Sequence, residues 1–558
     1  MKIFLKNTCF RNLISKNKLF YTVIQHPFSN NELFPDNKTK TSKSKGSAKV
    51  NVKNSSPKKA KKPVKTELER MIELDNNEVQ SNPVPSPSVT SKGKKGKRSK
   101  KESETTTITE KENIKTNIRS KVSKKKEEKT DETSTTSTKS ISIESIKLGN
   151  QYSDLRIDYS LKSERVYENP YEEYIQNRSS LVTKSYILNE RTSSCYNYAP
   201  LPVVLVSGNG IIVQDVDNYN YVDFLSGYSS LNFGHCNKDI LEPVIPQMSQ
   251  LHMTSRAFHN TLMGSASKIL ASLFDLDKVL FMNSGVEAGE SAVKFARRWG
   301  YKVKNIPDNE AEVVFFSGNF WGRTIAACAS SDDKSRINHF GPFDGLKFHI
   351  VPYNDIPKLE EFLKERPNIC AIMLEPIQGE AGIIIPEEDY LLRVRELCNK
   401  YNVLMIVDEI QTAFGRGSGN TTVCRSKNIK PDLLLLGKSL SGGFYPVSAV
   451  VGKNEVMDLI RPGEHGSTYG GNPLALRFVY STLNYLANGK CILEVINKEG
   501  IFSSYLKFQC KFIKEIRGRG MMFGIEIFED SPVSANEIAL YLMERGILCK
   551  PTKYNILR

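Results

Sequence analysis

The sequence of 558 residues has no apolar run near the roughly 20 residues that a membrane-spanning helix requires. The longest candidates, at 402–407 and 446–451, have only the length of a strand, so an integral membrane protein is excluded. The ten cysteines contain no C-x-x-C pair and no dense cluster. This pattern excludes a disulfide scaffold and a structural zinc site. We therefore expect reduced, mostly packed thiols and no metal.

Acidic residues are scarce only in the first part of the chain. Residues 1–150 hold 34 Lys and Arg against 16 Asp and Glu, whereas the remaining residues hold 44 against 46. The net charge of +16 therefore comes from an N-terminal tail, and a basic balance that favours nucleic acid applies to that tail alone. The part after residue 150 is nearly neutral and is long enough for one large domain or two smaller ones.

The first segment of the tail has the composition of a targeting signal. Residues 1–31 carry Lys2, Lys6, Arg11, Lys16 and Lys18 without any acidic residue, which is typical of a mitochondrial transit peptide. We expect location in the mitochondrial matrix, with the cytoplasm as the alternative.

The next segment, 32–150, is rich in Lys, Ser, Thr and Pro and has a single aromatic residue, Phe34. It cannot bury enough apolar surface to fold, so we expect a long disordered extension. The basic runs at 92–101 and 121–129 resemble nucleic-acid-binding patches, but they lack interleaved aromatic residues that would stack on bases. Residues 151–185 regain tyrosines, and a docking segment is one interpretation of them.

After residue 186 strand-like apolar runs alternate with helical patterns, which indicates an α/β fold with a mostly parallel sheet. Helices are predicted at about 287–301, 356–366 and 388–401. The predicted strands are Val279–Met282, Val313–Phe316, Phe348–Pro352, Cys370–Leu374, Val403–Val407, Leu433–Leu436 and Val447–Val451.

In such a sheet, ligands bind beyond the carboxyl ends of the strands. The turn at Asn283–Ala288 follows one strand and opens a predicted helix, where backbone amides and Gly285 suit a phosphate; a plain helix cap is the alternative. Asp408 ends an apolar strand, and a buried carboxylate is costly unless paired. It holds a cation, such as a protonated ring nitrogen, or caps a helix, and position alone does not decide.

Lys438 follows another apolar strand and precedes a Gly-rich turn. Burial there lowers an amine pKa, as a Schiff-base lysine requires; a surface lysine is the alternative. The turn, Asp408 and Lys438 together are more specific than any one of them. They supply a phosphate anchor, a ring-nitrogen partner and an imine-forming lysine for pyridoxal phosphate.

The stretch from about Leu188 to Arg558 resembles the class III pyridoxal-phosphate aminotransferases, and among them the ornithine aminotransferases. The matching blocks are SGVEAGESAVKFARRWGY from Ser284, NFWGRT from Asn319, EPIQGEAG from Glu375, VDEIQTAFGR from Val407, LGKSLSGGFYPVSAV from Leu436 and PGEHGSTYGGNP from Pro462.

This resemblance implies a type I aminotransferase fold within 186–558. A large cofactor domain at about 240–465 would have a mostly parallel sheet with helices on both faces, and a smaller α+β domain would come from both chain ends. A homodimer with active sites at its interface is implied as well. The cofactor phosphate would be held by backbone amides of Gly285 and Val286 and by Thr468 of the other subunit.

The resemblance also implies roles around the cofactor ring. Lys438 would form the imine and then transfer the proton as general acid/base. Asp408 would keep the ring nitrogen protonated, Phe320 would stack on the ring, and Gln411 would contact its hydroxyl side.

For the substrates L-ornithine, 2-oxoglutarate and L-glutamate, the resemblance implies a switch. Glu380 would mask Arg558 while Arg323 and Tyr198 hold the α-carboxylate and α-amine end of ornithine. Glu380 would later release Arg558 to bind the α-carboxylate of 2-oxoglutarate by a bidentate contact. Tyr228 would line the pocket. The alternative for the Glu380 and Arg558 pair is a surface ion pair worth at most about 1 kcal/mol.

Two departures from the family stand out. The chain stops at Arg558, where the family continues for a further strand and helix, so we expect an unsupported arginine side chain and either a truncated product or impaired activity. The tail of about 185 residues exceeds the family's usual leaders.

Other interpretations stay open. The chain resembles other class III enzymes acting on acetylornithine or 4-aminobutyrate, although Trp321 stands where acetylornithine enzymes usually have histidine. A weakly active aminotransferase-like protein with a nucleic-acid-binding tail is the third interpretation. The presence of Lys438 and Asp408 disfavours it, whereas the short C-terminus favours it.

Overall fold

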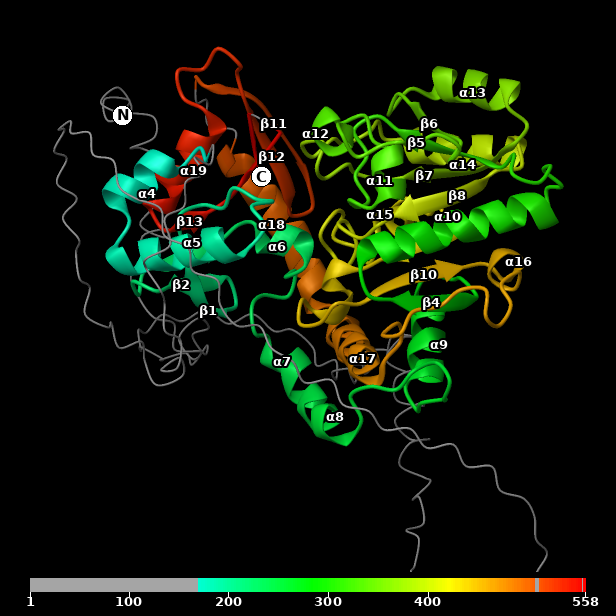
Figure 1. Cartoon of the computed structure of the whole chain (residues 1–558), viewed down its shortest axis with the longest axis horizontal. Helices are drawn as coiled ribbons and strands as arrows, with labels where there is room; N and C mark the ends of the chain where they lie inside the picture. Colours follow the sequence, from blue (N-terminus) through cyan, green and yellow to red (C-terminus); the bar gives the residue numbers. More distant parts are fainter. Residues whose placement is uncertain (1–168, 507–510, 554) are drawn as a thin grey trace, which may run out of the picture. The chain divides into compact units, whose positions relative to one another are not determined.

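The computed structural model describes residues 169–506, 511–553 and 555–558 (Figure 1). The predicted transit peptide at 1–31, the predicted disordered segment at 32–150 and residues 151–168 of the predicted docking segment lie outside the described residues. Among the described helices, each is too short or too polar to cross a lipid bilayer.

A seven-stranded sheet has the order β4-β10-β9-β8-β7-β5-β6. Strands β9, β8, β7, β5 and β6 are parallel, and β10 runs antiparallel to both β9 and β4. The prediction of a mostly parallel sheet is confirmed, and each predicted strand overlaps an observed one. The strands are β4 (Lys278–Met282), β5 (Glu312–Phe316), β6 (Phe348–Val351), β7 (Ile369–Leu374), β8 (Leu404–Asp408), β9 (Leu433–Leu436) and β10 (Ser448–Gly452).

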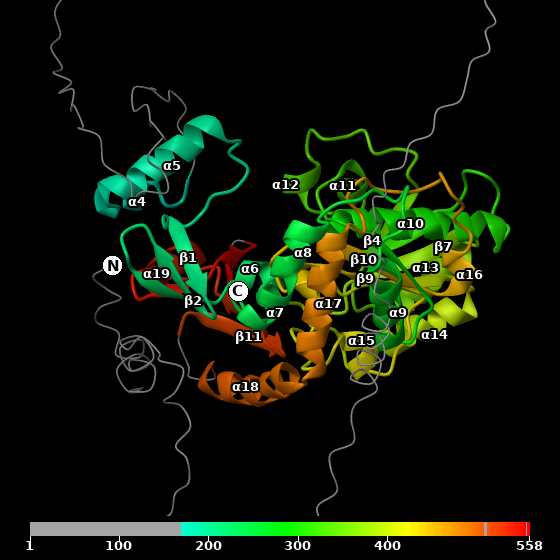
Figure 2. The same cartoon turned by 90° about the horizontal axis from the view of Figure 1, so that it is seen from below.

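Both faces of this sheet are buried. In β5, Val314 and Phe316 belong to one apolar cluster, whereas Val313 and Phe315 belong to another on the opposite face, because successive side chains of a strand alternate. Two-sided burial explains why the strands are uninterrupted apolar runs. One face is covered by α10 and the other by α9, α13, α14 and α17 (Figure 2). These helices are α9 (Met263–Leu273), α10 (Gly285–Lys302), α13 (Ile356–Glu365), α14 (Tyr390–Lys400) and α17 (Pro473–Ala487).

Two four-stranded sheets draw on more distant parts of the chain. One has the order β1-β2-β3-β13, and the other has the order β11-β12-β15-β14. Because β13 pairs in parallel with β3, the first sheet joins residues from both ends of the described chain. The strands are β1 (Leu205–Asn209), β2 (Ile212–Asp215), β3 (Asn220–Asp223), β11 (Ile513–Arg519), β12 (Met522–Ile527), β13 (Ile547–Leu548), β14 (Pro551–Thr552) and β15 (Ile556–Leu557).

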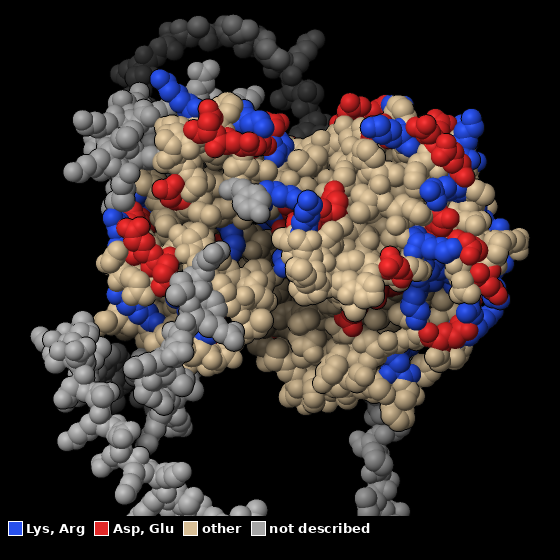
Figure 3. Space-filling model, turned by 45° about the horizontal axis from the view of Figure 1, so that its top comes forward, with Lys and Arg blue, Asp and Glu red and all other residues tan. Residues whose placement is uncertain are grey.

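The remaining helices are mostly short. Basic and acidic side chains are interspersed on the face seen in Figure 3, in keeping with the balanced charge after residue 150. The helices are α4 (Glu172–Arg178), α5 (Leu181–Ser193), α6 (Ser226–Ser229), α7 (Lys238–Leu241), η2 (Glu242–Val244), α8 (Ile245–Gln250), α11 (Ile325–Ala329), α12 (Lys334–Ile337), α15 (Val423–Ser426), η3 (Lys438–Ser441), α16 (Asn454–Met457), α18 (Lys490–Leu506) and α19 (Ala535–Met543).

Candidate active site

Three ionisable residues stand where neighbouring parallel strands end. Strand β8 ends at Asp408, Lys438 follows β9 after one glycine, and Glu375 directly follows β7. Because β7, β8 and β9 are adjacent and parallel, their carboxyl ends meet at one edge of the sheet, where α/β proteins bind ligands.

Lys438 opens the short helix η3 with a left-handed backbone, at φ 45°. The next residue, Ser439, donates a hydrogen bond of 2.6 Å to the carbonyl of Ser229 and so anchors the turn. Burial first, and the nearby Arg558 second, lower the pKa of Lys438 to about 8. A sizeable fraction of neutral amine is therefore present near neutral pH, which a nucleophilic lysine requires.

Asp408 is only 5% exposed. Its Oδ1 accepts a hydrogen bond of 2.9 Å from the backbone N–H of Ile410. Burial raises the pKa of Asp408 to about 6, while the Ile410 bond and the Lys438 charge oppose that rise. The carboxylate thus caps its own turn and still lacks a directly bonded cation among the described residues, so a protonated ring nitrogen would complete its pairing.

Glu375 is a buried acid that the sequence analysis missed. Its two carboxyl oxygens accept backbone N–H bonds from Phe320 at 2.9 Å and Gly379 at 3.2 Å. Burial, followed by the charge of Asp408, raises the pKa of Glu375 to about 8. The signal was available, because Glu375 follows the wholly apolar strand β7 just as Asp408 ends the wholly apolar β8.

The predicted phosphate turn lies at the start of α10. Ser284 caps this helix and forms a reciprocal capping box with Glu287, which leaves the first N–H groups, Gly285 and Val286, without intrahelical acceptors. A Cβ on Gly285 would lie 2.9 Å from Cδ1 of Ile410. Glycine therefore lets the turn pack closely against the segment that follows Asp408.

Phe320 stands two residues before Gly322, which packs against Val286 of this turn, and its ring lies close to two guanidinium groups. The guanidinium carbons of Arg336 and Arg323 are 4.6 and 5.9 Å from the ring centroid. Trp321 instead turns into the core, where its Nε1 donates a hydrogen bond of 2.8 Å to Ser330. Any influence of Trp321 on substrate choice therefore acts through packing.

Glu380, Arg558 and Gln411 form a closed triangle of hydrogen bonds. Arg558 donates to Glu380 at 2.6 Å and to the Gln411 oxygen, and the Gln411 amide donates to Glu380 at 3.1 Å. Burial acts to raise the pKa of Glu380, but Arg558 and Gln411 hold it below its usual value. The Arg558 side chain is 8% exposed. The expectation of an unsupported arginine is wrong, because the preceding strand β15 and this triangle hold it.

The predicted pocket residue Tyr228 lies in a strained turn. Ser226, Gly227, Tyr228 and Ser229 have φ of 54°, 54°, 56° and 73°, a left-handed run that costs about 1–3 kcal/mol for each non-glycine residue. Arg416 supports the turn by donating to the Ser226 hydroxyl at 3.1 Å. The Arg558 guanidinium lies 5.5 Å from the Tyr228 ring centroid, so the turn lies beside the triangle.

The other predicted substrate residues lie at the margin of this group. Tyr198 is 53% exposed, and the Arg323 guanidinium lies 5.6 Å from its ring centroid. Thr468 is exposed, and among the described residues no hydrogen bond joins it to Lys438 or Asp408. Within the chain, the structure therefore groups Lys438 and Asp408 with the Glu380 triangle and leaves Thr468 outside.

The residues at this sheet edge fit pyridoxal phosphate. A buried lysine with a lowered pKa, a buried acid without a bonded cation and a helix start with free N–H groups are the donor set that this cofactor requires. The residues that would hold it are Lys438, Asp408, Gly285, Val286, Phe320 and Gln411.

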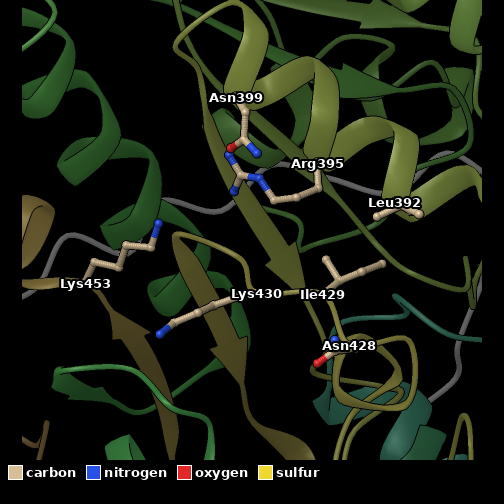
Figure 4. Close-up of a pocket in the computed structure, with 7 residues that line it drawn as sticks. All are labelled: Leu392, Arg395, Asn399, Asn428, Ile429, Lys430 and Lys453. Atoms are coloured by element: carbon tan, nitrogen blue, oxygen red, sulfur yellow. The ribbon is translucent and has the colours of Figure 1, made fainter.

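A separate cavity of about 280 Å³ lies at the opposite edge of the sheet (Figure 4). Beside it, Asp432 precedes β9 and binds Arg395 at 2.7 Å, Lys453 at 2.5 Å and the N–H of Met405 at 2.7 Å. No group of three or more His, Cys, Asp or Glu within the described part of the chain could hold a metal ion. The lining residues are Leu392, Arg395, Asn399, Asn428, Ile429, Lys430 and Lys453.

Comparisons with known proteins identify the family of the chain. The family model "Aminotransferase class-III" matches residues 194–558. The mitochondrial ornithine aminotransferase of Rattus norvegicus is 46% identical over 371 residues, 66% of this chain and 84% of that protein.

Solved structures are similar as well. The ornithine aminotransferase of Toxoplasma gondii ME49 is 42% identical with a TM-score of 0.66, covering 70% of this chain and 93% of that one. The acetylornithine aminotransferase of Elizabethkingia anophelis is 41% identical with a TM-score of 0.60, covering 67% and 92%. Because the family model covers most of the chain and these relatives are between 41% and 46% identical to it over the aligned residues, the chain belongs to the class-III aminotransferases and is a pyridoxal-phosphate-dependent enzyme.

Proposed function

We propose that this chain transfers the δ-amino group of L-ornithine to 2-oxoglutarate, which gives glutamate 5-semialdehyde and L-glutamate. The observation that carries the proposal is the buried ion pair of Glu380 and Arg558 at 2.6 Å beside Lys438. A donor with two amino groups and an acceptor with two carboxylates need an arginine that is masked in one half-reaction and free in the other.

The cofactor, when bound, supplies an electron-withdrawing ring that stabilises negative charge on the substrate carbon. Lys438 would hold the cofactor, and its Nζ would then accept and return the proton of the substrate carbon as general acid/base. Asp408 would keep the ring nitrogen protonated, because the negative charge of its buried carboxylate favours a cationic partner. Phe320 holds the ring in place, and Gly285 and Val286 donate backbone N–H groups to the phosphate.

Substrate orientation follows from two arginines. Arg323, with Tyr198 beside it, binds the α-carboxylate end of ornithine, so the δ-amine points toward Lys438. Meanwhile Glu380 and Gln411 neutralise and occupy Arg558. When Glu380 turns away, Arg558 is free to bind a carboxylate of 2-oxoglutarate through its planar fork.

A second function is favoured by one observation. The acetylornithine enzyme of Elizabethkingia anophelis is nearly as similar to this chain as the Toxoplasma gondii ornithine enzyme. An acetylornithine enzyme has no free α-amine to accommodate. Replacing Tyr198 by phenylalanine would then leave the activity unchanged.

The test is isotopic. Ornithine labelled with ¹⁵N at the δ position or at the α position is incubated with 2-oxoglutarate, and glutamate is analysed by mass spectrometry. The δ label is expected in glutamate and the α label is not. Label from the α position, or faster turnover of acetylornithine than of ornithine, would refute the proposal.

Assembly and location are also proposals. We propose a homodimer in which the exposed Thr468 reaches the partner's phosphate site; sedimentation of a single-mass monomer with full activity would contradict it. The large domain at about 240–465 and the smaller domain from both ends form the proposed division of each protomer.

We propose the mitochondrial matrix as the location of the protein, supported by the basic leader and by the name of the rat relative. A fluorescent fusion that stays in the cytoplasm would refute that.

A further inference from the structure

The loop at 462–471, which carries Thr468, is attached to α10 by a histidine that the mechanism above does not use. The imidazole of His465 has its Nε2 at 2.8 Å from the Ser291 hydroxyl and its Nδ1 at 3.0 Å from the Lys294 ammonium. Its ring packs edge-on against Phe295, with centroids 5.2 Å apart. The contact therefore joins loop and helix through both ring nitrogens.

These contacts fix the protonation state of the ring. A lysine ammonium has only donors, so Nδ1 of His465 must accept and carries no proton. The neutral ring then has its proton on Nε2 and donates it to Ser291. The single hydroxyl hydrogen of Ser291 is in turn donated to the carbonyl of Glu287 at 2.6 Å. Every donor in this chain of bonds has an acceptor only when His465 is neutral.

Protonation of His465 would break this arrangement. A proton on Nδ1 would face the Lys294 ammonium, so a hydrogen bond would be replaced by repulsion between like charges. The nearby Glu464 carboxylate already accepts from Arg298 at 2.6 Å and from the N–H of Arg461 at 2.8 Å. Burial first, and the charge of Lys294 second, lower the pKa of His465. The attachment therefore stays intact through the usual histidine range and is lost only when the pH falls below it.

The same loop has a second attachment close to the phosphate turn. The Asn283 amide donates a hydrogen bond of 2.9 Å to the Ser467 hydroxyl, and Asn283 lies two residues before Gly285. Thr468 directly follows Ser467. The helix that offers N–H groups to the phosphate and the loop that presents Thr468 are thus held in one register by two side-chain contacts.

We propose that His465 is a positioning residue of the cofactor site, whose neutral form fixes the 462–471 loop against α10 and whose protonation weakens cofactor binding. This inference rests on the proposed function, in which the α10 turn holds the cofactor phosphate of its own protomer and Thr468 reaches the phosphate bound by the other protomer.

The test measures the dissociation constant of pyridoxal phosphate by equilibrium dialysis of the full chain at a series of pH values from about pH 8 down to about pH 5. Wild-type protein is expected to bind more weakly at the lower pH, in part because Asp408 and Lys438, with pKa values of about 6 and about 8, also titrate over this range. His465→Gln keeps an amide donor and acceptor but cannot titrate. Over this range the dissociation constant of His465→Gln should rise by a factor that is roughly fivefold to tenfold smaller than the factor for wild type.

A matched control and a second variant complete the design. His349→Gln replaces another histidine, which lies on β6 and pairs with Glu312 at 2.6 Å. This variant should keep the wild-type pH dependence of cofactor binding. Lys294→Met removes the charge facing Nδ1, so the loss of affinity should begin at a higher pH than in wild type.

Full wild-type pH dependence in His465→Gln, or an unmoved midpoint in Lys294→Met, would overturn the inference alone. Wild-type protein that fails to bind the cofactor at about pH 8 would overturn the proposed function as well.

Discussion

Buried charged groups are paired differently at the two edges of the central sheet, that is, at the amino ends and at the carboxyl ends of its parallel strands. At the amino end of β9, Asp432 is 3% exposed, and two cations and a backbone N–H satisfy it. Each of these partners comes from a different element, since Arg395 lies on α14 and Lys453 follows β10. Such a saturated carboxylate serves to tie α14, β9 and β10 together.

At the carboxyl ends, charges are buried without saturation. Asp408 and Glu375 accept only backbone N–H bonds among the described residues, and the Lys438 amine has no hydrogen-bonded partner among them. The pKa of Glu375 is raised to about 8, that of Asp408 is raised to about 6, and that of Lys438 is lowered to about 8. Proton transfer near neutral pH requires groups in this condition, so the comparison separates an edge built for stability from an edge built for chemistry.

The strongest way to break the comparison is Lys438→Ala. We expect the turnover rate to fall by roughly 10⁴-fold or more, because the variant loses both the nucleophile and the proton-transfer group. The melting temperature should stay the same or rise, since a buried amine is removed. Steady-state kinetics and calorimetry check both parts, and a variant that keeps a tenth of the activity would contradict the assignment.

The opposite edge should show the reverse pattern. Asp432→Ala leaves the Arg395 and Lys453 charges without their carboxylate, so we expect the free energy of unfolding to fall by about 3–5 kcal/mol. Activity per folded molecule should be kept. The control is Asp458→Ala, which removes an exposed ion pair with Lys278 and should cost less than about 1 kcal/mol. Equal costs in urea unfolding would show that the buried group is not special.

Glu375→Gln sharpens the comparison within the carboxyl-end edge. The new amide group places its own N–H against the backbone N–H of either Phe320 or Gly379. Two donors cannot bond to each other, so the backbone at Phe320 or at Gly379 has to shift. We expect kcat to fall by roughly tenfold to a hundredfold with cofactor binding retained. Tyr353→Phe is the matched control, because it removes only the hydroxyl bond of 2.9 Å to the Glu375 carbonyl. A kinetic loss of similar size in both variants would reduce Glu375 to a structural role.

The last expected effect, about tenfold for each pH unit, is a pH dependence of cofactor binding that the titration of Lys438 causes. The rate at which pyridoxal phosphate binds the cofactor-free protein should rise about tenfold per pH unit up to about 8 and then level off. Because the folded-state pKa lies below the ordinary value of 10.5, the ammonium destabilises the fold fully below about pH 8. This penalty shrinks as the pH rises toward 10.5. Stopped-flow absorbance checks the rate, and a midpoint near 10.5 would mean that the amine is solvated.

Much of the fold could be predicted because the central strands are buried on both faces and therefore form plain apolar runs. The antiparallel direction of β10 could not be predicted, since the same apolar run of residues fits a parallel strand and an antiparallel strand equally well. The pairing of β3 with β13 joins residues more than 300 positions apart, and no local pattern encodes it.

The candidate site was predictable to a similar degree. Asp408 and Lys438 were visible as charges that interrupt apolar runs. The support of Arg558 by Gln411 was not, because Gln411 was expected only at the cofactor hydroxyl, and the left-handed turn at Tyr228 depends on Arg416 from a distant segment. Glu375 was missed although it carries the same signal as Asp408.

The most direct test of the central claim is to locate the cofactor on the chain. The purified protein is treated with borohydride, which reduces a C=N bond between a lysine and an aldehyde to a stable amine, and is then digested and analysed by mass spectrometry. We predict that the phosphopyridoxyl mass lies on Lys438 and is absent after prior incubation with ornithine. A label on Lys453 or Lys430, at the opposite edge of the sheet, or no label at all, would contradict the assignment of the chemistry to the carboxyl ends of β8 and β9.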